Sequence, residues 1–183
     1  MSTLKIDAWR FDEAVQRCRG FAGLFWVHLR AHWLTYVLVV LLWLAVSANY
    51  RVGWNETASL PQSLFIIHKG EPVAKGDYVA FTVPPDAAKH FKNSRAVLTK
   101  IVVGTEGDVV TVADRIVHVN GQAVGYAKTH SLKGEVLDPI APAKVPFGYM
   151  YVMGLHRDSL DSRYTIVGLV PYASVVGRAH PVF

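Results

Sequence analysis

AVLTKIVVGTEGDVVTVADRIVHVNGQAV, residues 96–124, carries the strongest structural signal in this chain. Its Val, Ile and Thr residues recur with period two, and the turn pairs Glu106-Gly107 and Asn120-Gly121 interrupt them. This pattern is typical of antiparallel β structure. An Asn-Gly pair suits a type I′ turn, which needs positive φ at both central residues. The sequence therefore predicts a β-hairpin from Arg115 to Val124.

The same pattern of short apolar runs separated by turn residues continues on both sides of this stretch. Apolar β-branched and aromatic runs recur in LFIIHKGEPVAKGDYVAFTVPP (64–85), YMYVMGL (149–155) and IVGLVP (166–171). Residues 125–147 instead contain Gly, Pro and Lys without a clear period, which indicates a loop or excursion between strands. We therefore expect a mainly β, antiparallel domain over residues 51–183.

The N-terminal part has a different character. Residues 33–50, WLTYVLVVLLWLAVSANY, contain no formal charge, and at about 1.5 Å per residue they would cross most of a hydrocarbon core of about 30 Å. The sequence predicts one transmembrane helix here. A buried helix and a cleaved signal peptide are the alternatives, but some thirty residues precede the run and aromatic residues flank it.

Basic residues are more frequent before residue 33 than just after residue 50. This asymmetry predicts a cytoplasmic segment at 1–32, with an amphipathic helix within 7–31, and places residues 51–183 on the other side of the membrane, in the periplasm if that is the inner membrane of a bacterium. Inner-membrane lipid is the partner expected for such an anchor.

Composition excludes several classes of protein. The chain has 183 residues and one cysteine, Cys18, so an internal disulfide and a cysteine-based zinc site are ruled out. The net charge is +5, but the nineteen Lys and Arg residues are scattered rather than clustered, which argues against nucleic-acid binding. We expect neither a cofactor nor a metal ion.

Three stretches hold polar groups that a β domain does not need for folding. Ser59 lies in NETASLPQS (55–63), Lys100 interrupts an apolar run, and GLHRDSLDSRY (154–164) contains two aspartates, two arginines and two serines. Each has a simple structural explanation. The serine would be a turn former, the lysine would extend along a sheet edge, and the third stretch would be a solvated turn in which Asp161 pairs with Arg163. A lysine held among apolar groups would instead have a lowered pKa and could act as a general base.

In this order, the three stretches resemble the signal peptidase I family. TASLP (57–61) resembles its nucleophile motif, LTKIVVGTEGDVV (98–110) the motif of its lysine base, and MGLHRDSLDSRY (153–164) with the downstream GLVP and VVGRA its C-terminal motif. The resemblance implies a signal-peptidase-like antiparallel β domain. It also implies a Ser-Lys dyad, in which Ser59 attacks the scissile carbonyl and Lys100 accepts its proton.

The resemblance assigns supporting roles as well. It implies an oxyanion hole made of the Ser59 backbone N–H and the Thr57 hydroxyl. Ser159 would orient the lysine amine, and Asp161 with Arg163 would hold the C-terminal motif together.

One spacing points to a branch of the family. Only Leu60 separates Ser59 from Pro61, whereas two residues are usual in signal peptidase I. This spacing resembles the conjugative-transfer, TraF-like peptidases. The implied partners are a pilin-like precursor and other conjugative transfer proteins of a type IV secretion system. Hydrolysis and cyclisation of the product both stay open, as do a housekeeping signal peptidase and a non-catalytic scaffold with the same fold.

Overall fold

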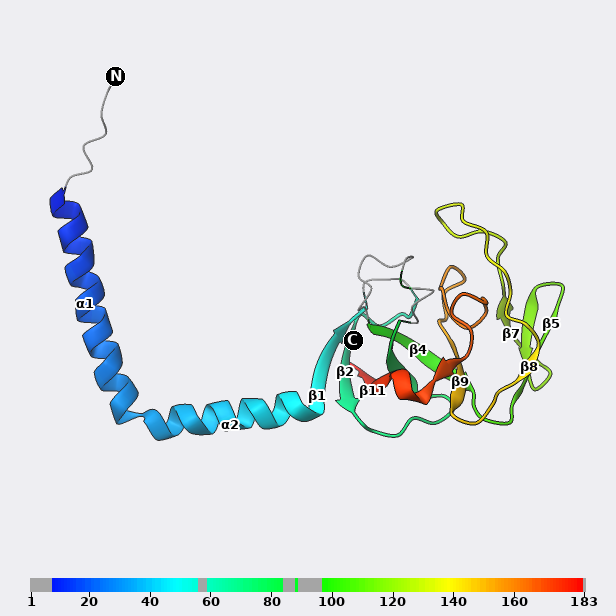
Figure 1. Ribbon diagram of the computed structural model, residues 1–183, viewed down its shortest axis with the longest axis horizontal. Coiled ribbons are helices and arrows are strands. Elements are labelled where there is room, and N and C mark those ends of the chain that lie inside the picture. The colour runs from blue at the N-terminus through cyan, green and yellow to red at the C-terminus, as the bar shows by residue number, and fades with distance from the viewer. Residues whose placement is uncertain (1–7, 56–58, 84–87, 89–96, 183) are drawn as a thin grey trace, which may run out of the picture. The chain divides into compact units, whose positions relative to one another are not determined.

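The structure is a computed structural model that describes residues 8–55, 59–83, 88 and 97–182, with side chains from residue 20 onwards. The chain divides into two compact units, Met1–Ser47 and Ala48–Phe183. Figure 1 shows helices in the first unit and strands in most of the second.

The first unit contains helix α1 (Ala8–Ala31) and nearly all of helix α2 (Trp33–Asn49). The predicted apolar span ends one residue early, because Tyr50 already begins the first strand. In the described part of the chain, no single helix is long and apolar enough to cross a membrane. Residues 20–31 and α2 reach that length only together, and they are bent by 77° at their break. The predicted span at 33–50 is thus a helix, α2, that reaches this length and composition only together with residues 20–31.

The second unit is built around a seven-stranded sheet in the order β1-β2-β11-β3-β4-β9-β10. All its pairings are antiparallel. The mainly β, antiparallel fold predicted from the sequence is therefore confirmed. The bounds of its strands are β1 Tyr50–Trp54, β2 Leu64–Lys69, β3 Tyr78–Thr82, β4 Val97–Gly104, β9 Tyr149–Met153, β10 Val170–Pro171 and β11 Val175–Pro181, with a 3₁₀ turn, η1, at Tyr172–Ser174.

A four-stranded sheet in the order β7-β6-β5-β8 extends this unit on the side away from β1 (Figure 1). Its strands are β5 Val109–Ala113, β6 Ile116–Val119, β7 Gln122–Tyr126 and β8 Ala143–Lys144. The predicted hairpin is β6–β7, in which Val119 pairs with Gln122. Asn120 has φ 51° and Gly121 has φ 80°, as a type I′ turn requires. This prediction is confirmed.

Residues 125–147 are mostly outside the strands, as the sequence indicated. Only the end of β7, the short strand β8 and two isolated bridges, His130 to Val136 and Pro139 to Tyr164, interrupt the loop. Both ends of its first half are fixed in the core, because Ala127 and Leu137 are buried with Val117 and Tyr151. The loop is thus a structured excursion from the sheets.

Strand β4 connects the fold to the site. Val79 of β3 lies opposite Lys100 in the register, and Val152 of β9 lies opposite Val102. The buried positions of β4 are Lys100, Val102 and Gly104, which alternate along the strand and share one face. The side chain of Lys100 therefore points towards the interior of the domain.

Candidate active site

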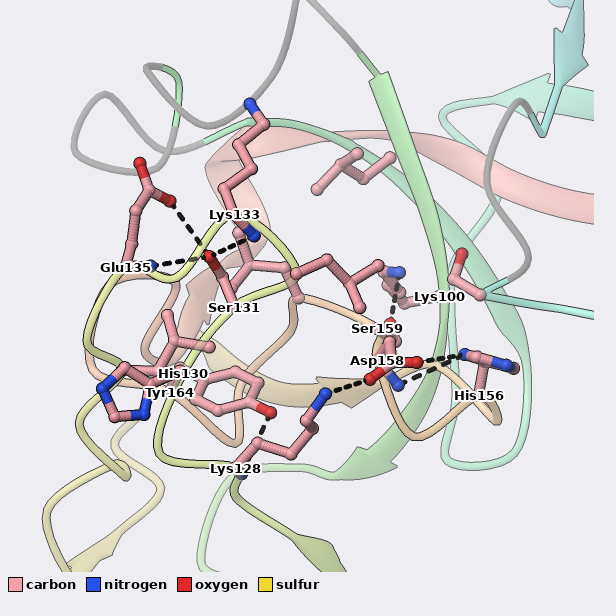
Figure 2. A pocket seen from close by; sticks show the side chains of 15 residues that line it. Lys100, Lys128, His130, Ser131, Lys133, Glu135, His156, Asp158, Ser159 and Tyr164 are labelled. Atoms are coloured by element: carbon pink, nitrogen blue, oxygen red, sulfur yellow. Dashed lines mark hydrogen bonds and ion pairs between the residues drawn. The ribbon is translucent and has the colours of Figure 1, made fainter.

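Lys100 is buried in the centre of the seven-stranded sheet, with 3% of its surface exposed. Its amine donates a hydrogen bond of 2.7 Å to the hydroxyl of Ser159 (Figure 2). The interpretation of Lys100 as an edge lysine is wrong, because β4 has a partner strand on each side.

Burial governs the charge of this amine. Loss of hydration lowers the pKa of Lys100 from 10.5 to about 8, while the nearby Asp161 raises this pKa and Arg163 lowers it. Desolvation has this direction because it disfavours the charged form of a lysine. The two charged neighbours oppose each other, so the burial effect dominates. A larger fraction of molecules therefore carries an uncharged Lys100 amine near neutral pH than would with an exposed lysine.

Ser59 lies at the same cavity as Lys100. The cavity has a volume of about 390 Å³ and is lined by Ser59, Lys100 and Ser159, among others. Ser59 is 5% exposed, and its carbonyl oxygen accepts a hydrogen bond of 3.2 Å from the backbone N–H of His156. The fold thus brings together the serine and the lysine that the sequence separates by forty residues.

Gly154 allows this close approach. A Cβ atom built at Gly154 would lie 2.2 Å from the hydroxyl oxygen of Ser159 and 2.9 Å from the carbonyl oxygen of Ser59. Neither distance is possible for real atoms, and the second neighbour is backbone that cannot rotate away. The contact between the two serine-bearing segments therefore requires glycine at this position.

Asn55 fixes the segment that follows the serine. Its side-chain amide donates to the carbonyl oxygens of Leu60, at 3.3 Å, and Gln62, at 3.1 Å, and its backbone N–H donates to Ser63 at 2.8 Å. Leu60 is buried against Phe65. The segment directly after the serine is therefore fixed by hydrogen bonds to Asn55 and by the burial of Leu60. Our sequence analysis did not assign this role to Asn55, although Asn is a common residue in side-chain-capped turns.

Asp161 and Arg163 form a buried ion pair, so the interpretation of a solvated turn is wrong. Asp161 is 0% exposed, and its carboxylate accepts bonds of 2.8 and 2.9 Å from the Arg163 guanidinium. The same carboxylate accepts a bond of 2.9 Å from the backbone N–H of Gly154. Arg163 in turn donates to the carbonyl oxygens of His156 and Ser159. The pair therefore ties together the turn that presents the Ser159 hydroxyl to Lys100.

Five of the six residues predicted for the site thus gather around one cavity or support it. They are Ser59, Lys100, Ser159, Asp161 and Arg163. Thr57, predicted to contribute to the oxyanion hole, lies outside the described residues. In the described part of the chain, no group of three or more His, Cys, Asp or Glu residues could hold a metal ion.

A further wall of the cavity comes from the first half of the 125–147 loop, to which the sequence assigned no role. Figure 2 shows His130, Ser131 and Glu135 of this loop on one side, and Lys100 with Ser159 on the other. The segment has no hydrophobic period that could have signalled this position. Only the folded arrangement brings it to the cavity.

A known protein family matches most of this chain. The family described as signal peptidase, peptidase S26, matches residues 26–183. The chain belongs to this family. Membership supports a serine peptidase, because that is the chemistry of peptidase S26.

The similar proteins include two relatives and one solved structure. The conjugal transfer protein TraF of Agrobacterium fabrum is 33% identical over 151 residues, which cover 74% of this chain and 82% of the relative. A probable thylakoidal processing peptidase 2 of Arabidopsis thaliana is 34% identical over 108 residues, 56% of this chain and 27% of the relative. A signal peptidase I from Enterococcus faecalis has 26% identity and a TM-score of 0.36, over 59% of this chain and 97% of that structure.

Proposed function

We propose that this protein is a serine endopeptidase of the signal peptidase I type that removes the leader from an exported precursor. Ser59 is the nucleophile and Lys100 the general base. The observation that carries the proposal is the buried Lys100 amine at the same cavity as Ser59, bonded to Ser159 and with its pKa lowered to about 8.

The lowered pKa matters because only the uncharged amine can accept a proton. At pH 7 about one in ten amines with a pKa of 8 is uncharged, against about one in three thousand at a pKa of 10.5. The base is therefore available some hundreds of times more often than that of an exposed lysine. This difference supports general-base chemistry at neutral pH without a histidine.

The reaction proceeds in two halves. The hydroxyl oxygen of Ser59 attacks the scissile carbonyl carbon while its proton passes to the Lys100 amine. The tetrahedral intermediate collapses, the C–N bond breaks, and Lys100 returns the proton to the leaving amine. Water then attacks the carbonyl carbon of the acyl-enzyme ester and gives a proton to Lys100. The ester C–O bond breaks, Lys100 returns the proton to the Ser59 oxygen, and the product leaves with a new carboxyl end.

Supporting groups hold these partners in place. Ser159 orients the amine through its 2.7 Å hydrogen bond, and Asp161 with Arg163 holds the turn that carries Ser159. The backbone N–H of Ser59 and the hydroxyl of Thr57 stabilise the oxyanion. Removal of one such donor typically costs about 2.7–4 kcal/mol of transition-state stabilisation.

The proposed substrate is a pilin-like subunit of a conjugative type IV secretion system. Its support is the similarity to a conjugal transfer protein over most of both chains. Attack on the acyl-enzyme by the amino terminus of the product, in place of water, would close a ring. The mass of the processed subunit separates the two outcomes, since a ring lacks one water.

The proposed location is the inner membrane, with residues 1–32 in the cytoplasm and the β domain in the periplasm. The apolar pair formed by residues 20–31 and α2 supports an anchor, and no residue of α2 is buried in the fold. Protease added to spheroplasts should digest the β domain and spare the N-terminal segment. The reverse pattern would refute this topology.

Precursor processing in cells tests the activity. Ser59→Ala and, separately, Lys100→Met should leave the precursor at full length, because each removes one member of the dyad. Ser63→Ala and Lys69→Met are matched controls on exposed positions nearby and should process normally. Normal processing by both dyad variants would reject the peptidase and favour a non-catalytic scaffold.

A further inference from the structure

The cavity has one wall that none of the proposed catalytic residues explains. Residues 128–136, called the wall segment here, run along it between the buried residues Ala127 and Leu137. The wall segment is largely exposed, in contrast to these two ends. It is therefore a surface loop with fixed ends that faces the proposed dyad.

Arg115 fastens both ends of the wall segment. It lies in the turn between β5 and β6 with φ 64°, and its guanidinium donates to three carbonyl oxygens. These are Ala127 at 2.6 Å and Lys128 at 2.7 Å on one end, and Leu137 at 2.6 Å on the other. Hydrogen bonds from a charged donor are stronger than neutral ones. One side chain thus keeps the two ends at a set separation.

A second tie connects the wall segment to the turn that carries Ser159. The Lys128 amine forms an ion pair with Asp158, the residue before Ser159 (Figure 2). The backbone N–H of Lys128 also donates to the hydroxyl of Tyr164 at 3.3 Å. The wall therefore has a defined position relative to the Lys100–Ser159 bond.

The tip of the wall segment is held by its own hydrogen bonds. The hydroxyl of Ser131 accepts from the backbone N–H groups of Lys133 and Glu135, both at 3.2 Å, and Gly134 has φ 80°. Leu132, at this tip, lines the cavity and is 82% exposed. A leucine in this position adds little to the stability of the core, but its apolar surface is available to contact a bound polypeptide.

We propose that the wall segment selects the substrate: Arg115 positions it, and Leu132 contacts an apolar side chain of the precursor. This inference rests on the proposed peptidase function. The apolar class of contact is supported by the other leucines at the cavity, Leu98, Leu137 and Leu160. Leu132 is then a specificity-determining residue, and Arg115 acts through the loop rather than on the substrate.

Leu132→Asn tests the contact, because it keeps the size of the side chain and makes it polar. The probe is a fluorescein-labelled synthetic signal peptide with an apolar core and an Ala-Gln-Ala junction. Binding is measured by anisotropy with the full chain in detergent, in a Ser59→Ala background that cannot cleave it. We expect Leu132→Asn to weaken binding about tenfold, or about 1.4 kcal/mol, and Leu132→Met to restore it.

Val136→Thr is the matched control. Val136 belongs to the same wall segment and is 72% exposed, but it does not line the cavity. It should bind the peptide as the parent does. With Ser59 restored, Leu132→Asn should raise KM and leave kcat unchanged, because a contact made equally in the ground state and transition state affects binding alone.

Arg115→Ala tests the positioning role by an independent readout. Loss of the guanidinium should free the wall segment, so trypsin should cut after Lys133 faster than in the parent chain, and KM should rise with little change in kcat. Lys144→Ala removes an exposed charge from the same small sheet and should change neither. Unchanged cleavage at Lys133 and unchanged KM would overturn the role of Arg115.

The outcomes separate the two proposals. If the parent chain cleaves the peptide while Leu132→Asn binds and cleaves equally well, the selecting wall is refuted and the peptidase stands. If the parent neither cleaves nor binds the peptide, the peptidase fails and the wall proposal fails with it.

Discussion

Replacement of Lys100 by methionine should make the protein more stable at neutral pH while it abolishes activity. The reason is the cost of burying a charge. A difference of one in pKa corresponds to about 1.36 kcal/mol. The lowering of the Lys100 pKa from 10.5 to about 8 means that its charged form destabilises the fold by roughly 3 kcal/mol.

Methionine has a similar length and no charge, so it removes this cost. It also removes the hydrogen bond to Ser159, whose buried hydroxyl would lose its donor at a cost of about 1 kcal/mol. The net expectation is a gain of about 2 kcal/mol in the free energy of unfolding at pH 6.5.

The pH dependence provides a second signature. Below pH 8 the lysine is charged in both the folded and unfolded chains, and the full cost is present. Between pH 8 and 10.5 the unfolded chain binds a proton that the folded chain does not, so stability rises with pH in this window. The methionine variant lacks this rise, and the advantage of the variant should vanish by about pH 10.5.

Urea unfolding of the full chain in detergent, followed by near-ultraviolet circular dichroism from pH 6.5 to 10.5, measures both effects. Lys69→Met, at an exposed position, should change the midpoint little at any pH. A Lys100→Met variant that unfolds at lower urea than the parent at pH 6.5, with an unchanged slope, would show that Lys100 is not a desolvated charge. The assignment of Lys100 as a poised base would then lose its physical basis.

Three further changes test other parts of the site. The kcat/KM of cleavage should rise with pH through a pKa near 8 and level off, since the uncharged Lys100 amine is the active form; a rise that continues beyond pH 10 would contradict this. Gly154→Ala should lower kcat at least about a hundredfold by displacing the Ser159 hydroxyl, whereas Gly23→Ala, which meets nothing within 4 Å, should be neutral. Tyr151→Phe removes a buried hydroxyl that has no hydrogen-bond partner among the described residues, so the melting temperature should be unchanged or higher. A loss above about 1 kcal/mol would reveal a partner for that hydroxyl.

Local features of the fold could be predicted because they depend on neighbouring residues. The β6–β7 hairpin follows from Asn120-Gly121, whose conformation is set by steric preference at two positions. The shared face of Lys100 and Val102 is likewise local, because residues two apart along a strand lie on the same side of a sheet. These predictions needed no information about distant parts of the chain.

Burial could not be predicted in the same way. The sequence left Lys100 between an edge position and the core, and only the pairing of β4 with both β3 and β9 resolves the choice. The break between the two helices coincides with the predicted boundary at residues 32–33, but no proline or glycine there indicates the 77° bend.

The wall segment could not be predicted from the sequence for a different reason. Its residues have no hydrophobic period because most of them face solvent, and its shape depends on Arg115, which lies outside the segment in the sequence. The Gly, Pro and Lys residues of 125–147 as a whole predict a loop, but they do not predict which part of the fold that loop contacts. The cavity wall is therefore a tertiary property.

The buried Asp161–Arg163 pair connects the stability of the site with its proposed chemistry. Asp161 is needed to hold the Gly154 backbone, but alone its charge would favour a protonated Lys100 and return the lysine pKa towards its ordinary value. Arg163 opposes that effect while it fastens the carbonyl oxygen of Ser159. Replacing a buried ion pair with apolar residues often costs a fold nothing, so stability alone does not explain the pair. A carboxylate that organises the turn, together with a guanidinium that offsets part of the carboxylate's effect on the amine, does explain it. The pair lets a structural anion lie beside the proposed base while the pKa of that base stays lowered, at about 8.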